Sequence, residues 1–225
     1  MSLKVPQSQV EGLKALVRLS PEAKGRLLKA LRETQPTLQR NKIEETATRS
    51  SGIPAGDVHE IMKVLTTLYI VREERAVPLD KFVEELCVAA TETKAPELTL
   101  TGKARDEFRD YMRELLSLDR TVGVTAKALS LLNEYKLRFC GARIMTDLRP
   151  IFGSDPSKLP LANVLVHTLR IQYHQGQNLE EEYVALDTSD VKELRLLLDR
   201  ALQKEAALEE LSKAAGLLCL KVDGQ

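Results

Sequence analysis

Tryptophan is absent from this 225-residue chain, and aromatic residues make up only 4% of it. A hydrophobic core must therefore consist mainly of Leu, Val, Ile and Ala side chains. Net charge is also absent, because 33 Lys and Arg residues balance 33 Asp and Glu residues. A nucleic-acid-binding domain usually carries a basic excess, so we do not expect nucleic acid as a partner.

Cysteine is scarce and widely spaced, at Cys87, Cys140 and Cys219. No C-x-x-C pair is present, so we interpret the three residues as reduced thiols of a cytoplasmic protein. A membrane helix needs about 18 to 20 consecutive apolar residues, and no run approaches that length. The N-terminal stretch "MSLKVPQSQVEGL" also lacks the apolar segment of a signal peptide. We therefore expect no membrane span.

Recognisable catalytic and ligand-binding motifs are missing as well. His59, His167 and His174 form no H-x-x-x-H pair, and no glycine-rich phosphate-binding loop occurs. His167 and Cys140 are better explained as core residues of apolar strands. The acidic run at 180–182 lies on a strand, where neighbouring side chains point to opposite faces and do not converge on a cation. We predict no catalytic residue, metal site or cofactor, and hence no enzyme; an enzyme of unrecognised type is the third hypothesis.

Residues 1–135 have the apolar periodicity of an all-α N-terminal domain. In "LSPEAKGRLLKALRET", Ser20 is a candidate N-cap, Pro21 suits the first helical position and Glu22 favours the helix dipole. The Thr-rich segment 91–102 is the best candidate for a linker. The other predicted helices lie in "SQVEGLKALVRL", in two segments around "SSGIP", in "VPLDKFVEELCVAA", in "KARDEFRDYMRELLSL" and in "TAKALSLLNEY".

Residues 136–225 change to a pattern of strands followed by one helix. The segment "YKLRFCGARIMTDLRPIFG" is interpreted as one bent strand, and 163–187 as a hairpin around the turn "QGQN". A helix is predicted from Ser189 to about Leu211, with Asp190 and Glu193 at capping-box spacing. The chain is therefore predicted to be α+β and mostly helical, a helical bundle followed by a small antiparallel sheet covered by a long C-terminal helix.

The hairpin and the final helix are each amphipathic, so each needs a covering partner. We expect the strand residues Leu165, Leu169 and Ile171 to pack against the helix. The expected contacts on the helix are Leu194, Leu198 and Ala201.

The apolar stripe of the helix continues beyond that contact, through Leu208 and Leu211. This surplus apolar surface predicts a protein partner or a homo-oligomer. Leu198, Leu208, Leu211 and the strand residue Tyr173 are the predicted interaction residues. The leading hypothesis is a non-enzymatic assembly protein that associates with itself through its C-terminal module.

A helix-turn-helix transcription regulator using residues 42–76 is the alternative. Gly52 would form the turn, and "LYIVREERAVPL" would form a wing. Asp57 and Glu60 lie near the start of the second helix, where their carboxylates would repel the DNA backbone. A basic surface around 42–76 would favour this alternative.

The order of these elements resembles that of COMM-domain proteins. "LSPEAKGRLLKAL", "GIPAGDVHEIMKVLTTLYIV" and "VPLDKFVEEL" are similar to the helical domain of that family. "ARIMTDLRPIF", "VLVHTLRIQYHQ" and "EEYVALDTSDVKELRLLLDRAL" resemble its C-terminal module of three strands and a helix. The family's usual tryptophan in the first strand is missing. The resemblance implies an interaction protein whose C-terminal modules pair with one another.

Overall fold

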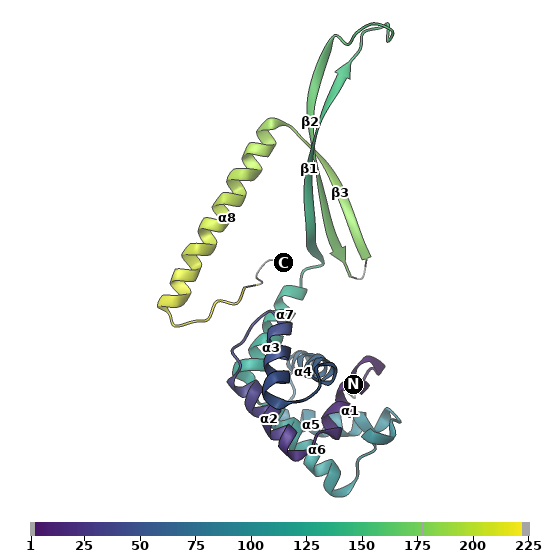
Figure 1. Ribbon diagram of the computed structural model, residues 1–225, viewed down its shortest axis with the longest axis vertical. Coiled ribbons are helices and arrows are strands. Elements are labelled where there is room, and N and C mark those ends of the chain that lie inside the picture. The colour runs from purple at the N-terminus through teal and green to yellow at the C-terminus, as the bar shows by residue number, and fades with distance from the viewer. Residues whose placement is uncertain (1–2, 177, 222–225) are drawn as a thin grey trace. The chain divides into compact units, whose positions relative to one another are not determined.

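The chain divides into two compact units, one made mainly of the residues up to Asn133 and the other of Glu134–Cys219. The computed structural model describes residues 3–176 and 178–221. The fold is α+β and mostly helical, as predicted. Helices alone form the first unit, whereas the second contains a three-stranded antiparallel sheet and a long helix (Figure 1).

The first unit follows the predicted series of helices closely. Its elements are α1 (Gln7–Arg18), α2 (Pro21–Glu33), α3 (Arg40–Ser51), α4 (Ala55–Arg75), α5 (Leu79–Glu92), the 3₁₀ turn η1 (Pro96–Leu98), α6 (Gly102–Leu115), the π-helical turn η2 (Asp119–Gly123) and α7 (Val124–Asn133).

The start of α2 shows why the sequence signals there are reliable. The Ser20 hydroxyl accepts a hydrogen bond from the backbone N–H of Ala23 at 3.2 Å, and Pro21 occupies the first helical position. The side-chain bond satisfies one of the N–H groups that a helix start leaves without a partner. The predicted N-cap is therefore confirmed.

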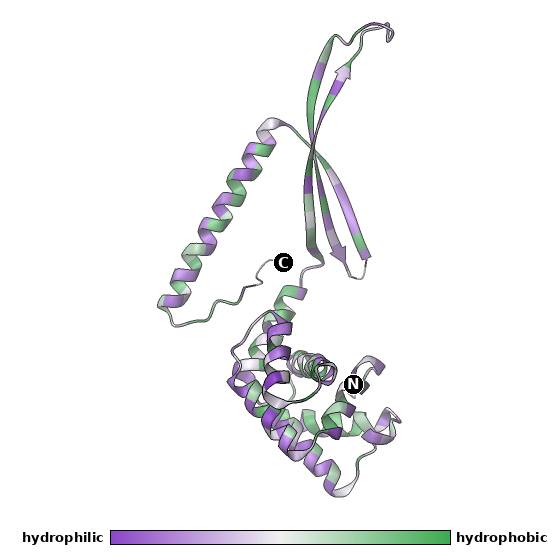
Figure 2. Cartoon of the chain, viewed as in Figure 1, coloured by the Kyte–Doolittle hydropathy of each residue, from purple (hydrophilic) through white to green (hydrophobic). Residues whose placement is uncertain are grey.

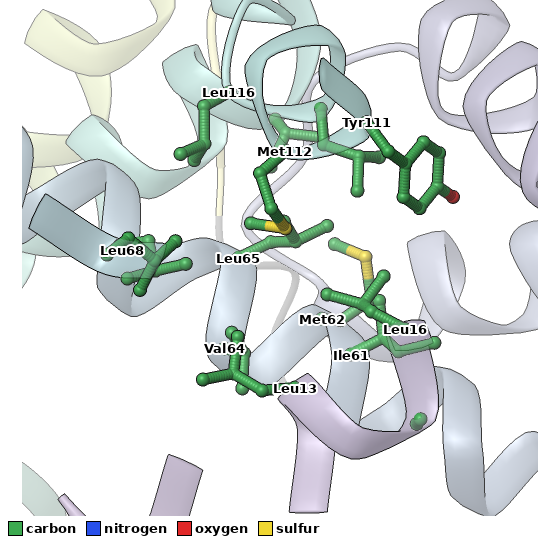
Figure 3. Packing of buried hydrophobic residues seen from close by; sticks show 14 of the residues in the cluster. Leu13, Leu16, Ile61, Met62, Val64, Leu65, Leu68, Tyr111, Met112 and Leu116 are labelled. Carbon is green, nitrogen blue, oxygen red and sulfur yellow. The ribbon is translucent and has the colours of Figure 1, made fainter. Parts of the chain in front are cut away.

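The helix α4 is the centre of the first unit. Its buried residues lie on several sides of the helix, because other helices surround it. Figure 3 shows side chains of α1, α4 and α6 meeting in this core. Gly12 of α1 lies so close to α4 that a Cβ atom there would be 2.3 Å from both the Glu60 carbonyl oxygen and Val64 Cγ2.

Polar side chains of α4 also fasten the end of α6. The buried Tyr69 hydroxyl donates to the Leu115 carbonyl at 2.9 Å, and Arg72 donates to the Leu116 carbonyl at 2.6 Å. The same guanidinium reaches Asp119 of η2 at 3.0 Å. These bonds satisfy carbonyl groups that the end of a helix leaves without partners.

The second unit begins with a long β-hairpin. Strand β1 (Leu137–Ile151) pairs antiparallel with β2 (Ala162–Gln175), and β3 (Asn178–Leu186) pairs antiparallel with residues 167–175 of β2. The strand order is β1-β2-β3 (Figure 1). The predicted bend in the first strand is a β-bulge between Phe139 and Gly141.

The helix α8 (Thr188–Ala214) follows β3 almost directly. The predicted capping box is misplaced by three residues: Asp187 is the N-cap and Asp190 is the third helical residue. The Asp187 carboxylate accepts from the N–H groups of Ser189 (2.6 Å) and Asp190, and Asp190 accepts from the Asp187 N–H. Asp187 takes the cap because β3 ends at Leu186, which makes it the first residue free of the strand ladder.

Two other predictions for the first unit are wrong. The segment 91–102 is not a linker, because η1 lies within it and its Leu98 side chain is only 1% exposed. The expected wing does not form either, because α4 continues through Arg75. In both segments, packing against the helical core overrides the local sequence signals.

Candidate assembly surface

The sheet of the second unit has one apolar face and one polar face. Opposite residues of an antiparallel ladder share a face, so the register assigns the side chains. Ile144, Leu169 and Val184 lie opposite one another across the three strands and form the centre of the apolar face. Arg170 lies between Arg143 and Tyr183 on the polar face. We call the first surface the apolar sheet face; it also includes Phe139, Ala142, Leu148, Leu165, Ile171 and Tyr173.

Much of the apolar sheet face is open to solvent. Phe139 is 70% exposed, Leu165 61% and Leu148 60%, and even the central Ile144 is 49% exposed. A three-stranded sheet gains stability by burying such a face against another element. The apolar sheet face therefore has side chains that a further apolar surface could cover.

The helix α8 also carries exposed apolar residues, and Figure 2 shows hydrophobic residues recurring along its length between hydrophilic ones. We call the exposed leucines on one side of the helix the α8 stripe: Leu197, Leu198, Leu202, Leu208 and Leu211, which are 55–66% exposed. No described residue of α8 is buried, and among its apolar residues only Val191 and Leu194, near its start, are half-buried.

The predicted packing of the hairpin against this helix is therefore wrong within a single chain. Leu165 and Leu198, which were expected to meet, are 61% and 66% exposed. One residue, Asp187, connects β3 to α8, and its side chain is engaged in the cap. The predicted interaction residues Leu198, Leu208 and Leu211 are all exposed on α8.

Tyr173, the fourth predicted interaction residue, lies on the apolar sheet face opposite Phe139. Its hydroxyl donates to Glu182 at 3.4 Å. Partial desolvation, followed by the charge of Glu182, raises the pKa of Tyr173 above its ordinary value. This side chain is half-buried and lies at the polar end of the apolar sheet face, which Glu180 and Glu182 of β3 share.

The three glutamates at 180–182 alternate between the faces, as predicted. Glu181 lies on the polar face, where it pairs with Arg170 at 2.6 Å and accepts from the Tyr183 hydroxyl at 2.8 Å. These hydrogen bonds, Tyr183 first, lower the pKa of Glu181. Glu180 and Glu182 face the other way, so the three carboxylates do not converge.

His167 and Cys140 are not core residues within the single chain, contrary to the prediction. The His167 ring is half-buried, with Nδ1 hydrogen-bonded to the Thr146 hydroxyl at 2.8 Å. Cys140 is exposed because it occupies the bulge of β1. The two differences have separate causes: the face that would bury His167 has no cover, and the bulge removes Cys140 from the strand alternation.

The segment proposed as a helix-turn-helix forms α3, a turn and α4. Gly52 adopts a φ of 73°, which favours glycine, and the Ser51 hydroxyl accepts from the Ile53 N–H at 3.2 Å. Val58 and the later apolar residues of α4 are buried in the core of the unit. Asp57 is exposed in the first turn of α4, where the sequence places a carboxylate that opposes DNA phosphates.

Metal-binding and membrane-spanning features are absent from the described parts of both units. Within residues 3–176 and 178–221, no three His, Cys, Asp or Glu side chains are grouped so that they could hold a metal ion. No helix in that same part of the chain is long and apolar enough to cross a membrane.

The free edge of β1 was not predicted from the sequence. The local pattern in "ARIMTDLR" indicates only the faces of the strand, because Ala142, Ile144 and Leu148 alternate with the charged residues Arg143 and Asp147. That alternation is typical of a strand with one covered face.

Comparison of the sequence with known protein families and with curated proteins finds no match. The resemblance to COMM-domain proteins thus depends on the order of the elements: a helical unit, three antiparallel strands and a long helix.

Proposed function

We propose that this chain is a non-enzymatic assembly protein, and that residues 137–225 bind a second copy of the same chain. One observation carries the proposal. The apolar sheet face and the α8 stripe belong to the same unit, and both are largely exposed. Each surface has the chemistry that the other needs, so two copies of the chain can cover both.

In the arrangement that we propose, α8 of one copy lies on the apolar sheet face of the second, and α8 of the second copy lies on the apolar sheet face of the first. Full burial of one Leu or Phe side chain contributes about 1.5–3 kcal/mol. Association costs about 4–15 kcal/mol in lost freedom of motion. Two sheet faces and two helix stripes together supply enough such side chains to exceed this cost.

The remaining predictions are consistent with this proposal. The resemblance to COMM-domain proteins supports self-association, because it implies that C-terminal modules pair with one another. Cys87, Cys140 and Cys219 are free, which supports a reducing compartment such as the cytoplasm.

The test compares two leucines of α8 that are equally exposed but point in nearly opposite directions. Leu198 belongs to the α8 stripe, and Leu196 is two residues, or about 200°, away around the helix. They are 66% and 69% exposed. We expect Leu198→Asp to reduce the mass measured by size-exclusion chromatography with light scattering, whereas Leu196→Asp leaves it unchanged. Leu208→Asp should behave like Leu198→Asp.

A wild-type protein that is monomeric at all concentrations would refute the proposal. Nanomolar binding to a defined DNA duplex, lost in Arg49→Ala, would instead support the transcription-regulator alternative. Circular dichroism of each variant separates a loss of assembly from a loss of folding.

A further inference from the structure

The outer edge of β1 has no strand beside it in the described chain. β1 pairs with β2 along one side only, because the strand order is β1-β2-β3. The Ile151 carbonyl accepts a hydrogen bond from the Leu161 N–H at 2.7 Å, so it points toward the β2 side. Peptide groups alternate along a strand, and those of Ala142, Ile144 and Leu148 consequently point outward. Such an edge is a template for another strand.

The two edges of the sheet are protected differently. Proteins guard exposed edges with bulges, prolines and charges. On β1 the bulge at Phe139/Gly141 and the proline Pro150 protect only the two ends, and the stretch between them carries charges of both signs, which a second copy can match. On β3 the consecutive carboxylates at 180–182 would face those of a second copy. The edge of β1 is therefore the one that is open to pairing.

Two charged side chains on β1 indicate what fits this edge. Arg143 and Asp147 lie on the polar face and make no ion pair or side-chain hydrogen bond with another described residue. In a two-fold antiparallel pairing centred on Met145, Arg143 lies opposite Asp147 of the second copy, and the reverse. Both belong to the residues whose peptide groups point to β2, so they form a non-hydrogen-bonded pair. Side chains approach most closely in such pairs, with Cα atoms about 4.5 Å apart.

Neighbouring registers lack this complementarity. Pairing centred on Thr146 places Arg143 opposite Arg149, and pairing centred on Asp147 places the two Asp147 residues opposite each other. Like charges directly opposite are destabilising. Pairing centred on Leu148 restores opposite charges but shortens the ladder to 145–151. It also brings Pro150 into the ladder, and a proline has no backbone N–H to donate.

We propose that two copies of the chain join β1 to β1, antiparallel and centred on Met145. This inference rests on the proposed self-association and specifies one of its interfaces. The two three-stranded sheets become one sheet of six strands. The two-fold axis is perpendicular to the sheet, so the apolar sheet faces of both copies lie on the same side and form one continuous surface.

The first test reverses the charges. Arg143→Asp places two carboxylates opposite each other at both ends of the pair, and Asp147→Arg places two guanidinium groups there. We expect each variant to raise the dissociation constant of the dimer about tenfold or more. An equimolar mixture of the two variants restores opposite charges at both positions, so it should form a heterodimer close to wild-type affinity. Arg149→Asp is the control, because Arg149 lies opposite Gly141, which has no side chain.

The second test uses a disulfide at the two-fold axis. In a Cys140→Ser, Cys219→Ser background, Met145→Cys should give a covalent dimer under mild oxidation. Ala185→Cys lies in the same row of the polar face, on the far strand, and should not.

The outcomes separate the two proposals. A wild-type dimer that neither charge reversal weakens, or that Met145→Cys fails to cross-link, overturns this interface and leaves the proposed function standing. A wild-type monomer overturns both. Weakening by each single reversal with recovery in the mixture establishes the register, because misfolded variants would not recover on mixing.

Discussion

Replacing Gly12 by alanine is expected to destabilise the helical unit, although alanine favours helices. The new Cβ would lie 2.3 Å from the Glu60 carbonyl oxygen and from Val64 Cγ2, whereas real Cβ contacts are essentially never below 3.0 Å. The carbonyl belongs to the backbone of α4 and cannot rotate away, so α1 must move outward. Overpacking of this kind costs about 1–3 kcal/mol, and a backbone neighbour places the cost near the upper end.

A matched substitution isolates the contact from helix propensity. Gly25 is an exposed glycine in α2, and a Cβ atom added there would have nothing within 4 Å. Alanine there should stabilise the protein by about 1 kcal/mol, the ordinary difference in helix propensity. The same gain at Gly12 offsets part of the cost, which leaves a net loss of about 2 kcal/mol. The two variants should therefore differ by about 3 kcal/mol, with opposite signs relative to wild type.

Urea unfolding followed by circular dichroism at the helical band measures both differences. A Gly12→Ala protein as stable as wild type, alongside a Gly25→Ala protein that gains stability, would refute the expectation. That result would mean that α1 and α4 are not in close contact at this position.

Two further predictions concern thiol reactivity and the start of α8. Burial raises the pKa of the Cys87 thiol and shields it, whereas Cys140 and Cys219 are exposed. A thiol reagent should therefore modify two groups in the native protein and the third only after unfolding. Rapid modification of all three thiols would contradict the buried position of Cys87. Asp187→Ala removes the acceptor for two backbone N–H groups and should weaken α8 by about 1 kcal/mol, with faster hydrogen exchange in its first turn. Asp187→Asn keeps an acceptor and should change little; equal exchange in the alanine variant would argue against the cap.

The helical unit was largely predictable because its signals are local. A capping serine, a proline in the first turn and apolar residues at helical spacing suffice to place α2, and similar patterns place the other helices. The errors arose where distant packing decides. Leu98 anchors a Thr-rich stretch that resembles a linker, and α4 continues through a segment that resembles a wing, because both pack against the core.

The candidate surface was predictable only in part. Alternation in β2 and the stripe of α8 indicate that both need covering, but periodicity does not say which chain provides the cover. The exposed positions of Leu165 and Leu198 show that the single chain does not provide it. Strand order and register determine the free edge of β1, and neither is encoded in the local pattern of one strand.

The row of glutamates on β3 also bears on the tendency of the single chain to aggregate. A newly made copy presents an apolar sheet face and an open strand edge, the features from which disordered aggregates and fibrils grow. Growth of a sheet in both directions needs two edges that can pair, and the adjacent glutamates of β3 oppose the pairing of one β3 edge with another. Edge-to-edge growth through two β3 edges is thereby opposed. In the proposed dimer both β1 edges are paired, so only the charged β3 edges would remain free.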